Sequence, residues 1–251
     1  MKIALIGSGN VATVLGRLIV NSNHQVCQVI SRELSHARVL ADELGATATD
    51  FDGTPDKTAD LYIIAISDTA LDHFFVKGAI SDKVVVHTAG SVSKDVLLNF
   101  AKSYGVLYPL QTLRKEMMHI PPIPLLVDGN DEASTAFIES FARSISNNVQ
   151  RTNDEQRLKL HAAAVIVSNF TNHLYAIAED FCVKENVDFD MLKPLVIETA
   201  LRITHASPAK VQTGPAIRKD ILTLDKHLRL FTAHPKLRTM YLRLTDSIMN
   251  P

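Results

Sequence analysis

The first twenty residues, MKIALIGSGNVATVLGRLIV, place a glycine-containing turn between two apolar stretches. Residues 3–6 form a short apolar run, which is typical of a strand buried on both faces of a parallel sheet. From residue 11 onward, apolar residues recur at helical spacing. The turn between them, GSGNVA, matches the G-x-G-x-x-G/A pattern that joins the first strand and helix of dinucleotide-binding units.

The alternation of strand-like and helix-like segments continues to about residue 150. Further strands are expected at residues 25–30, 46–49, 61–66, 84–86, 106–108 and 124–127, and helices at residues 34–44, 71–80 and 132–146. Strands that alternate with helices indicate an α/β protein with a doubly wound, mostly parallel, Rossmann-like sheet. We therefore predict a dinucleotide-binding domain over residues 1–151.

Each residue of the glycine turn has an expected role. Gly7 permits a tight turn, Gly9 lets the backbone approach a pyrophosphate, and Ala12 keeps the helix close to the strand. Ser8, Asn10 and Val11 complete the predicted phosphate-binding turn, because the positive N-terminus of the helix faces the phosphates. The alternative is an ordinary turn between a strand and a helix.

The end of the second predicted strand indicates which dinucleotide binds. An NAD site usually has Asp or Glu about 20 residues beyond the glycines, to bind the ribose 2′-hydroxyl. Here Ser31 and Arg32 occupy that place, and a hydroxyl beside a guanidinium suits a 2′-phosphate. We predict NADP as the cofactor. The neighbouring Glu33 and a purely surface role for Arg32 keep NAD open.

Small and polar residues follow the later strands directly. Ligands of doubly wound sheets lie outside the carboxyl ends of the strands. We therefore expect Ile66, Ser67, Thr88 and Gly90 to contact the cofactor, with His87 and Thr88 available on the sheet side of the substrate. The alternative is plain turn chemistry, since these residue types also favour loops.

Residues 152–251 are predicted to form a separate, all-helical domain for substrate binding or dimerisation. The stretch Thr152-Asn153-Asp154-Glu155 is interpreted as a capping box that opens a helix running to about residue 185. The central part of this helix is apolar nearly all round, so it must be enclosed by other helices or by a partner chain. We predict a homodimer built around it. Further helices are expected near residues 192–203 and after Pro235.

Polar residues interrupt the long apolar helix at regular intervals. His161, Ser168 and Asn172 have the spacing of one helix face, with Asn169 beside them. We predict His161 as the proton-transferring group and Asn169 and Asn172 as orienting groups, although buried residues of these types are often simply paired.

A loop further along carries a second candidate. Arg218 could clamp a substrate carboxylate with two hydrogen bonds. The alternative is a structural pair between Arg218 and Asp220, with Asp220 capping the next helix.

Composition excludes several classes of protein. The net charge is −1 and no basic run occurs, so neither nucleic acid nor an anionic membrane surface is an expected partner. No apolar span of transmembrane length is present, and no cluster of residues suggests a metal site. The two cysteines, Cys27 and Cys182, lie far apart, which suits a soluble protein of the reducing cytoplasm.

Four segments together resemble a known group of proteins: GSGNVA, YPLQT, HAAAVIVSNFTNHL, and TGPAIRKD followed by His227-Leu228. The first resembles pyrroline-5-carboxylate reductases. The whole chain is similar to bacterial proteins that join a Rossmann-like domain to a helical domain of unknown function. That family usually has Arg-Gly-Asp where this chain has Arg218-Lys219-Asp220. The resemblance implies an NADP-dependent oxidoreductase, dimeric through its helical domain.

The leading functional hypothesis is an oxidoreductase that moves a hydride between NADP(H) and a small carbonyl or imine compound. The rival hypothesis is a sensor or regulatory module that binds NADP on a dehydrogenase-like fold without catalysis, because fold alone does not decide function. A flavin or deazaflavin partner is a third possibility.

Overall fold

The computed structural model describes residues 1–71, 80 and 82–251. The described chain forms two compact units, Met1–Val167 and Ser168–Pro251, and each is described by itself. The helix expected at residues 71–80 falls almost wholly outside the described residues. The boundary expected at residues 151/152 coincides with the end of the last strand, whereas the division between the two compact units falls later, inside the long helix.

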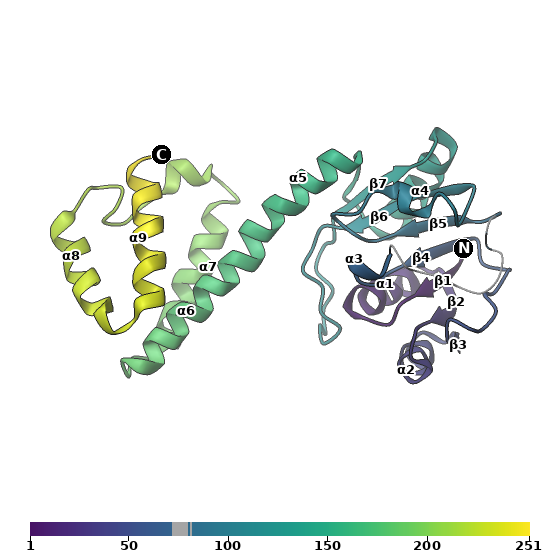
Figure 1. The fold of residues 1–251 in the computed structure, drawn as a ribbon, viewed down its shortest axis with the longest axis horizontal. Coiled ribbons are helices and arrows are strands. Elements are labelled where there is room, and N and C mark those ends of the chain that lie inside the picture. Colours follow the sequence, from purple (N-terminus) through teal and green to yellow (C-terminus); the bar gives the residue numbers. More distant parts are fainter. Residues whose placement is uncertain (72–79, 81) are drawn as a thin grey trace. The chain divides into compact units, whose positions relative to one another are not determined.

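The first unit contains one eight-stranded sheet in the order β3-β2-β1-β4-β5-β6-β7-β8 (Figure 1). Its strands are β1 (Lys2–Ile6), β2 (Gln25–Ile30), β3 (Thr47–Thr49), β4 (Leu61–Ile64), β5 (Val84–His87), β6 (Ser103–Pro109), β7 (Leu125–Gly129) and β8 (Val149–Arg151). All neighbours pair in parallel except β6 and β7. The prediction of a doubly wound, mostly parallel sheet is confirmed, and β8 is the strand that the sequence did not indicate.

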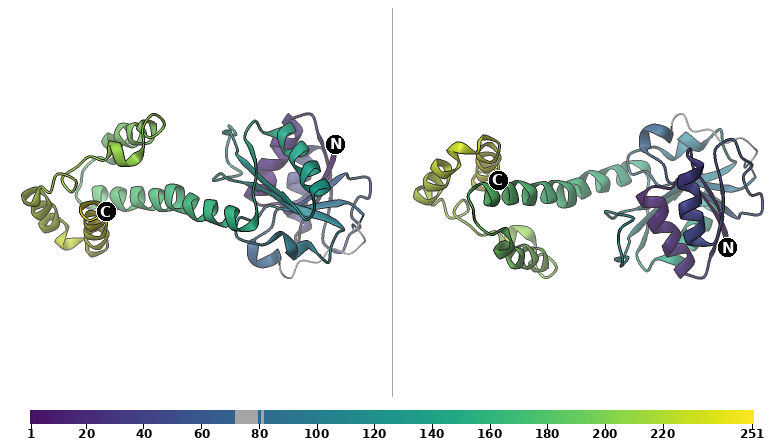
Figure 2. Two further views of the ribbon diagram at one scale, coloured as in Figure 1. Left: turned by 90° about the horizontal axis from the view of Figure 1, so that it is seen from above. Right: turned by 90° about the horizontal axis from the view of Figure 1, so that it is seen from below.

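Different described elements cover the two faces of this sheet. One face packs against α1 (Asn10–Asn21), α2 (Leu34–Leu44) and α4 (Glu132–Ile145). The other packs against α3 (Asp68–Leu71), the 3₁₀ turn η1 (Lys94–Leu97) and loops. Figure 2 shows α1 and α2 side by side. Strands covered on both faces read as continuous apolar runs, which explains why β1 and β4 were recognisable from sequence.

The strand order reverses at β1, which pairs with β2 on one side and β4 on the other. The Gly7 N–H donates to the carbonyl oxygen of Ile30 at 2.7 Å, and the Ala65 N–H donates to that of Ile6 at 2.7 Å. These bonds hold the chain just beyond three adjacent strands at one edge of the sheet. Such a reversal point is where doubly wound sheets bind ligands.

A continuous helical stretch follows β8. It consists of α5 (Asp154–Ala164), a π-helical segment (Val165–Phe170) and α6 (Thr171–Lys184), so the predicted helix to about residue 185 is confirmed. Two details of the prediction are wrong. The capping box is formed by Asn153 and Gln156, so it begins one residue later than a box that starts at Thr152. The π-helical turns also change the periodicity, so α-helical spacing does not place His161 and Asn172 on one face.

The second unit is helical throughout its described secondary structure. Besides α6 it contains η3 (Phe189–Leu192), α7 (Lys193–Arg202), η4 (Pro208–Val211), α8 (Ile221–Leu230), η5 (Phe231–Ala233) and α9 (Pro235–Met249). Phe181 packs edge-on against Phe231 and His234, which joins α6 to the α8–α9 region. Within the described part of the chain, none of the helices is both long and apolar enough to span a membrane.

Candidate functional site

The glycine turn lies where β1 meets α1. Gly7 has φ +119°, and a β-carbon built there would lie 2.2 Å from the Ala65 carbonyl oxygen. No L side chain fits that space. Gly9 differs, because a β-carbon there meets no atom of the described residues within 4 Å. Gly7 is therefore required by the fold, whereas the absence of a side chain at Gly9 leaves open space above the turn.

The start of α1 is free to bind an anion. Gly9 is its N-cap and provides no side-chain cap, and the first turn contains no acidic residue. The first N–H groups of a helix lack partners within the helix, and the helix dipole favours negative charge there. The Asn10 side chain is used elsewhere, since its Oδ1 accepts a hydrogen bond from the Lys115 N–H at 3.1 Å.

A cavity of about 680 Å³ opens beside this turn. Nine of the predicted cofactor residues line it: Gly7, Ser8, Gly9, Asn10, Val11, Ser31, Arg32, Ile66 and Ser67. Ala12 is completely buried and packs in the core, as its expected spacer role requires. Thr88 and Gly90 are not part of the described lining. The Thr88 side chain is buried, and its hydroxyl donates to the carbonyl oxygen of Ile64 at 3.3 Å.

Sequence reasoning missed six residues that line the same cavity: Glu33, His36, Phe51, Ala65, Thr69 and Ala70. From the sequence, the carboxylate of Glu33 is only an argument against NADP. His36 could have been found from its position in the first turn of the helix after Ser31 and Arg32. Phe51 gave no such signal, because it follows a short strand in an irregular turn.

Two hydroxyls connect the glycine turn to the end of β2. The Ser8 Oγ lies 2.8 Å from the Ser31 Oγ. Ser31 is nearly buried, whereas the Arg32 side chain is 85% exposed and its Nε lies 4.0 Å from a Glu33 carboxylate oxygen. An exposed guanidinium beside a hydrogen-bonded hydroxyl suits a phosphate group entering from solvent.

His161 lies over the end of β5, in the first unit. Its Nδ1 is 2.8 Å from the Tyr108 hydroxyl oxygen, and the two rings meet edge to face. A β-carbon built on Gly90 would lie 2.6 Å from that Nδ1 and 3.0 Å from the Tyr108 ring. Gly90 therefore has no side chain because His161 and Tyr108 occupy the space. This contact brings the predicted His161 to the carboxyl edge of the sheet.

A carboxylate lies near this pair. Asp68 accepts a hydrogen bond from the Ser91 hydroxyl at 2.6 Å. Burial raises the pKa of Tyr108, and the negative charge of Asp68 raises it further. Tyr108 is therefore a neutral phenol near pH 7, able to donate to or accept from His161.

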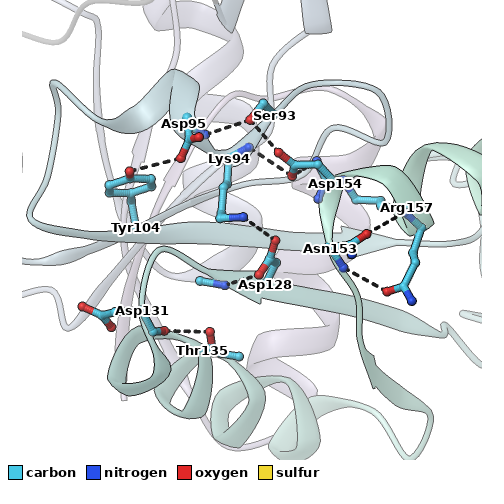
Figure 3. A network of polar contacts seen from close by, with 12 residues as sticks. Ser93, Lys94, Asp95, Tyr104, Asp128, Asp131, Thr135, Asn153, Asp154 and Arg157 are labelled. Atoms are coloured by element: carbon cyan, nitrogen blue, oxygen red, sulfur yellow. Dashed lines mark hydrogen bonds and ion pairs between the residues drawn. The ribbon is translucent and has the colours of Figure 1, made fainter.

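A polar network fixes the beginning of α5 to the loop after β5 (Figure 3). Asp154 accepts a hydrogen bond from the Ser93 hydroxyl at 2.5 Å and pairs with the guanidinium of Arg157 at 2.8 Å. Arg157 is 1% exposed and also donates to the carbonyl oxygen of Val92. Burial opposes ionisation of Asp154, but the hydrogen bonds from Ser93 and Arg157 outweigh it and lower the pKa of this carboxyl. The network holds α5 one turn before His161.

His87 has a structural role, so its expected place beside the substrate is wrong. Its side chain is fully buried, and its Nδ1 accepts a hydrogen bond from the Ala89 N–H at 3.1 Å. Burial, with the nearby positive charge of Arg157, lowers the pKa of His87 to about 4. His87 is therefore neutral near pH 7 and shapes the turn that carries Gly90.

The other predicted catalytic residues belong to the second unit. Asn169, Asn172 and Arg218 are all exposed there. Asp220 caps α8, because its carboxylate accepts hydrogen bonds from the N–H and hydroxyl of Thr223. The capping part of that alternative is thus confirmed, whereas no ion pair joins Arg218 to Asp220 among the described residues. Lys219 has φ +54°, a left-handed conformation that favours glycine.

The cavity fits a dinucleotide. Space without side chains lies above Gly9, the start of α1 provides open N–H groups, and Ser31 and Arg32 lie at the end of β2. These are the places where a doubly wound sheet binds a pyrophosphate and an adenosine ribose.

Comparisons with known proteins show the family of the chain. Residues 2–91 match the family described as NADP oxidoreductase coenzyme F420-dependent, and residues 123–248 match the domain of unknown function DUF2520. A comparison with curated proteins found no match.

Several solved structures resemble the chain, including the following three. A "putative NADP oxidoreductase" of Bacteroides fragilis is 36% identical with a TM-score of 0.92, and the match covers 100% of this chain and 98% of that one. Pyrroline-5-carboxylate reductase of Streptococcus pyogenes is 14% identical, with a TM-score of 0.64 and coverage of 100% and 99%. A reductive aminase of Aspergillus terreus, solved with NADPH and ethyl-5-oxohexanoate, is 13% identical, with a TM-score of 0.70 and coverage of 98% and 94%. The last two show the fold alone.

The fold, with these matches, places the chain in the class of Rossmann-fold NADP oxidoreductases. Within that class, the chain belongs to the family of the Bacteroides fragilis protein, in which an NADP oxidoreductase domain precedes a DUF2520 domain. The predicted family resemblance is confirmed, and so is NADP as the cofactor of the family.

Proposed function

We propose that this protein transfers a hydride between NADP(H) and a small carbonyl or imine compound. The observation that carries the proposal is the position of His161, hydrogen-bonded to Tyr108 above Gly90 at the carboxyl edge of the sheet that carries the dinucleotide cavity. The similarity in fold to a fungal reductive aminase and a streptococcal 1-pyrroline-5-carboxylate reductase supports this substrate class.

Different residues of the cavity would bind different parts of NADP(H). The N–H groups at the start of α1 would bind the pyrophosphate, with Gly9 leaving room for it. Ser31 and Arg32 would bind the 2′-phosphate. NADPH, when bound, supplies the hydride.

Reduction of a carbonyl or imine also requires a proton. His161 would donate it to the substrate oxygen or nitrogen, and would accept it in the reverse direction. Tyr108 holds the imidazole by the 2.8 Å contact to Nδ1, so Nε2 is the nitrogen left for the substrate. Asn169 and Asn172 stay proposed orienting groups and Arg218 a proposed anion-binding group, and all three are exposed in the second unit.

We also propose a homodimer formed through the helical region. Many large apolar side chains there are exposed: Ile166, Val167, Phe170, Val183, Met191, Leu195, Ile197, Leu201, Ile221 and Leu222. Exposed apolar patches of this extent mark interaction surfaces. A second copy of the chain would bury them, as the apolar character of the long helix requires. Free, buried Cys27 and Cys182 fit a cytoplasmic protein.

The test is to titrate the protein with NADPH and then follow NADPH consumption with oxoacids, aldehydes, imines and coenzyme F420. We expect turnover with an imine or a carbonyl compound. His161→Ala should abolish turnover and leave NADPH affinity unchanged, whereas His205→Ala, at an exposed site of the second unit, should change neither. NADPH binding without turnover on any substrate would favour a sensor. Unchanged turnover in His161→Ala would remove His161 from the mechanism.

A further inference from the structure

The ribose end of the cavity carries three ionisable side chains from one short segment. Arg32 and Glu33 lie in the turn after β2, and His36 lies in the first turn of α2. The His36 N–H donates to the Glu33 carbonyl oxygen at 3.0 Å. This tight turn brings all three side chains to the lining of the same cavity.

Arg32 alone is a weak determinant of a 2′-phosphate. Its side chain is 85% exposed, so solvent screens its charge. The Glu33 carboxylate, 4.0 Å from its Nε, offsets that charge and would itself repel a phosphate. A site that prefers NADP therefore needs another donor to compensate for Glu33.

His36 provides that donor. Its imidazole lines the cavity, and among the described residues no side-chain hydrogen bond or ion pair engages it. A histidine can donate a hydrogen bond from either ring nitrogen, and it carries a positive charge when both are protonated. An anion next to an imidazole favours that charged form.

We propose that His36 is a specificity-determining residue that binds the 2′-phosphate of NADP(H) together with Ser31 and Arg32, and that Glu33 opposes it. The proposal rests on the proposed function, because it requires NADP(H) to occupy this cavity. The selectivity for NADP over NAD then depends on two opposing side chains of one turn. His36 attracts the 2′-phosphate, and Glu33 repels it.

The experiment measures dissociation constants of the full chain for NADPH and NADH by nicotinamide fluorescence. His36→Gln keeps a polar side chain but removes the imidazole, and we expect NADPH to bind about fivefold more weakly while NADH affinity changes less than about twofold. Glu33→Gln should strengthen NADPH binding a few-fold. Arg38→Gln is the control, because Arg38 is exposed on the same helix and is not part of the described lining.

Adenosine 2′,5′-bisphosphate and ADP provide a second pair of probes that lack the nicotinamide. The bisphosphate should lose affinity for His36→Gln, whereas ADP should not. An equal loss for NADPH and NADH would mean that His36 packs against the adenine, and would overturn the proposal. Unchanged NADPH affinity in His36→Gln would also overturn it while leaving the proposed function intact. Failure of the wild-type protein to bind NADPH would overturn both.

Discussion

The imidazole of His161 and the hydroxyl of Tyr108 lie 2.8 Å apart, although 53 residues separate them along the chain. Tyr108 ends the parallel part of the sheet and His161 lies on α5, so the pair connects the sheet edge to the helix that follows it. The contact is possible only because residue 90 has no side chain. Everything proposed about proton transfer depends on this relationship.

Tyr108→Phe removes the hydroxyl and keeps the ring. We expect turnover to fall about tenfold or more, because His161 loses the group that orients it, while NADPH affinity stays the same. Tyr104→Phe is a matched control on the same strand, since the Tyr104 hydroxyl binds Asp95 instead. Steady-state kinetics and cofactor titration make the comparison. Equal effects of the two substitutions on turnover would contradict an orienting role for Tyr108.

The two glycines of the first turn should respond differently to alanine. Gly7→Ala places a β-carbon against the Ala65 carbonyl at a positive φ, so we expect a loss of unfolding free energy of about 2 kcal/mol or more. Gly9→Ala meets open space and should change stability by less than about 0.5 kcal/mol, yet weaken NADPH binding at least about tenfold. Urea unfolding and NADPH titration measure the two effects. Full NADPH affinity in Gly9→Ala would place the pyrophosphate elsewhere.

Burial of His87 makes stability depend on pH. Its pKa is about 4 in the folded protein and 6.5 as a free side chain, so the unfolded chain binds more protons between these values. Stability therefore falls as the pH falls through this range, by at most about 3 kcal/mol in total and about 2 kcal/mol between pH 7 and pH 5. His87→Asn, whose amide oxygen can replace Nδ1, should reduce this slope. Urea unfolding at both pH values measures it.

The control for that experiment is His119→Asn, which changes an exposed histidine of the same unit. An unchanged slope in His87→Asn would mean that other groups cause the pH dependence.

Lys219→Gly should stabilise the protein. Lys219 has φ +54°, and a non-glycine residue in the left-handed region costs about 1 kcal/mol, partly offset by the greater freedom of glycine in the unfolded chain. We expect a gain of up to about 1 kcal/mol in unfolding free energy. Asn186→Gly is the comparison, because Asn186 has the same φ but asparagine tolerates it more readily, so its gain should be smaller. A loss of stability in Lys219→Gly would show that its side chain makes a stabilising contact.

The proposed homodimer can be tested by measuring the mass of the protein in solution. Light scattering should give about twice the 27.6 kDa mass of one chain. Leu195→Asp with Leu222→Asp should shift the protein toward the monomer, because both side chains are exposed apolar groups of the second unit that a partner would bury. Val39→Asp changes an equally exposed apolar residue on α2 and should leave the mass unchanged. A monomeric wild-type protein would end the proposal.

The first half of the fold was predictable because buried parallel strands are apolar without interruption and their turns carry glycine. The strand ends and the helices over residues 34–44 and 132–145 follow from those patterns. The cap of α5 was missed by one residue, since Thr152 and Asn153 can both cap and only the backbone conformation chooses between them.

Some features of the site could not be predicted from the sequence. The π-helical segment lies in an apolar stretch that gives no sign of its altered periodicity, so the shared face of His161 and Asn172 was an α-helical assumption. The contact between Tyr108 and His161 also depends on tertiary structure, because the Ser93–Asp154–Arg157 network fixes the beginning of α5. The sequence also does not show that His87 is buried. Because it is buried, it supports the turn at Gly90 and cannot contact the substrate.

The difference between Gly7 and Gly9 matters for tracing the ancestry of this group of proteins. A descendant that lost its nucleotide would still have to keep glycine at position 7, because the Ala65 carbonyl excludes any side chain there. Its presence in a related chain therefore records only inheritance of the fold. Position 9 is free to drift once no pyrophosphate lies above it. Substitution there is the mark by which a lineage that has abandoned its coenzyme can be recognised.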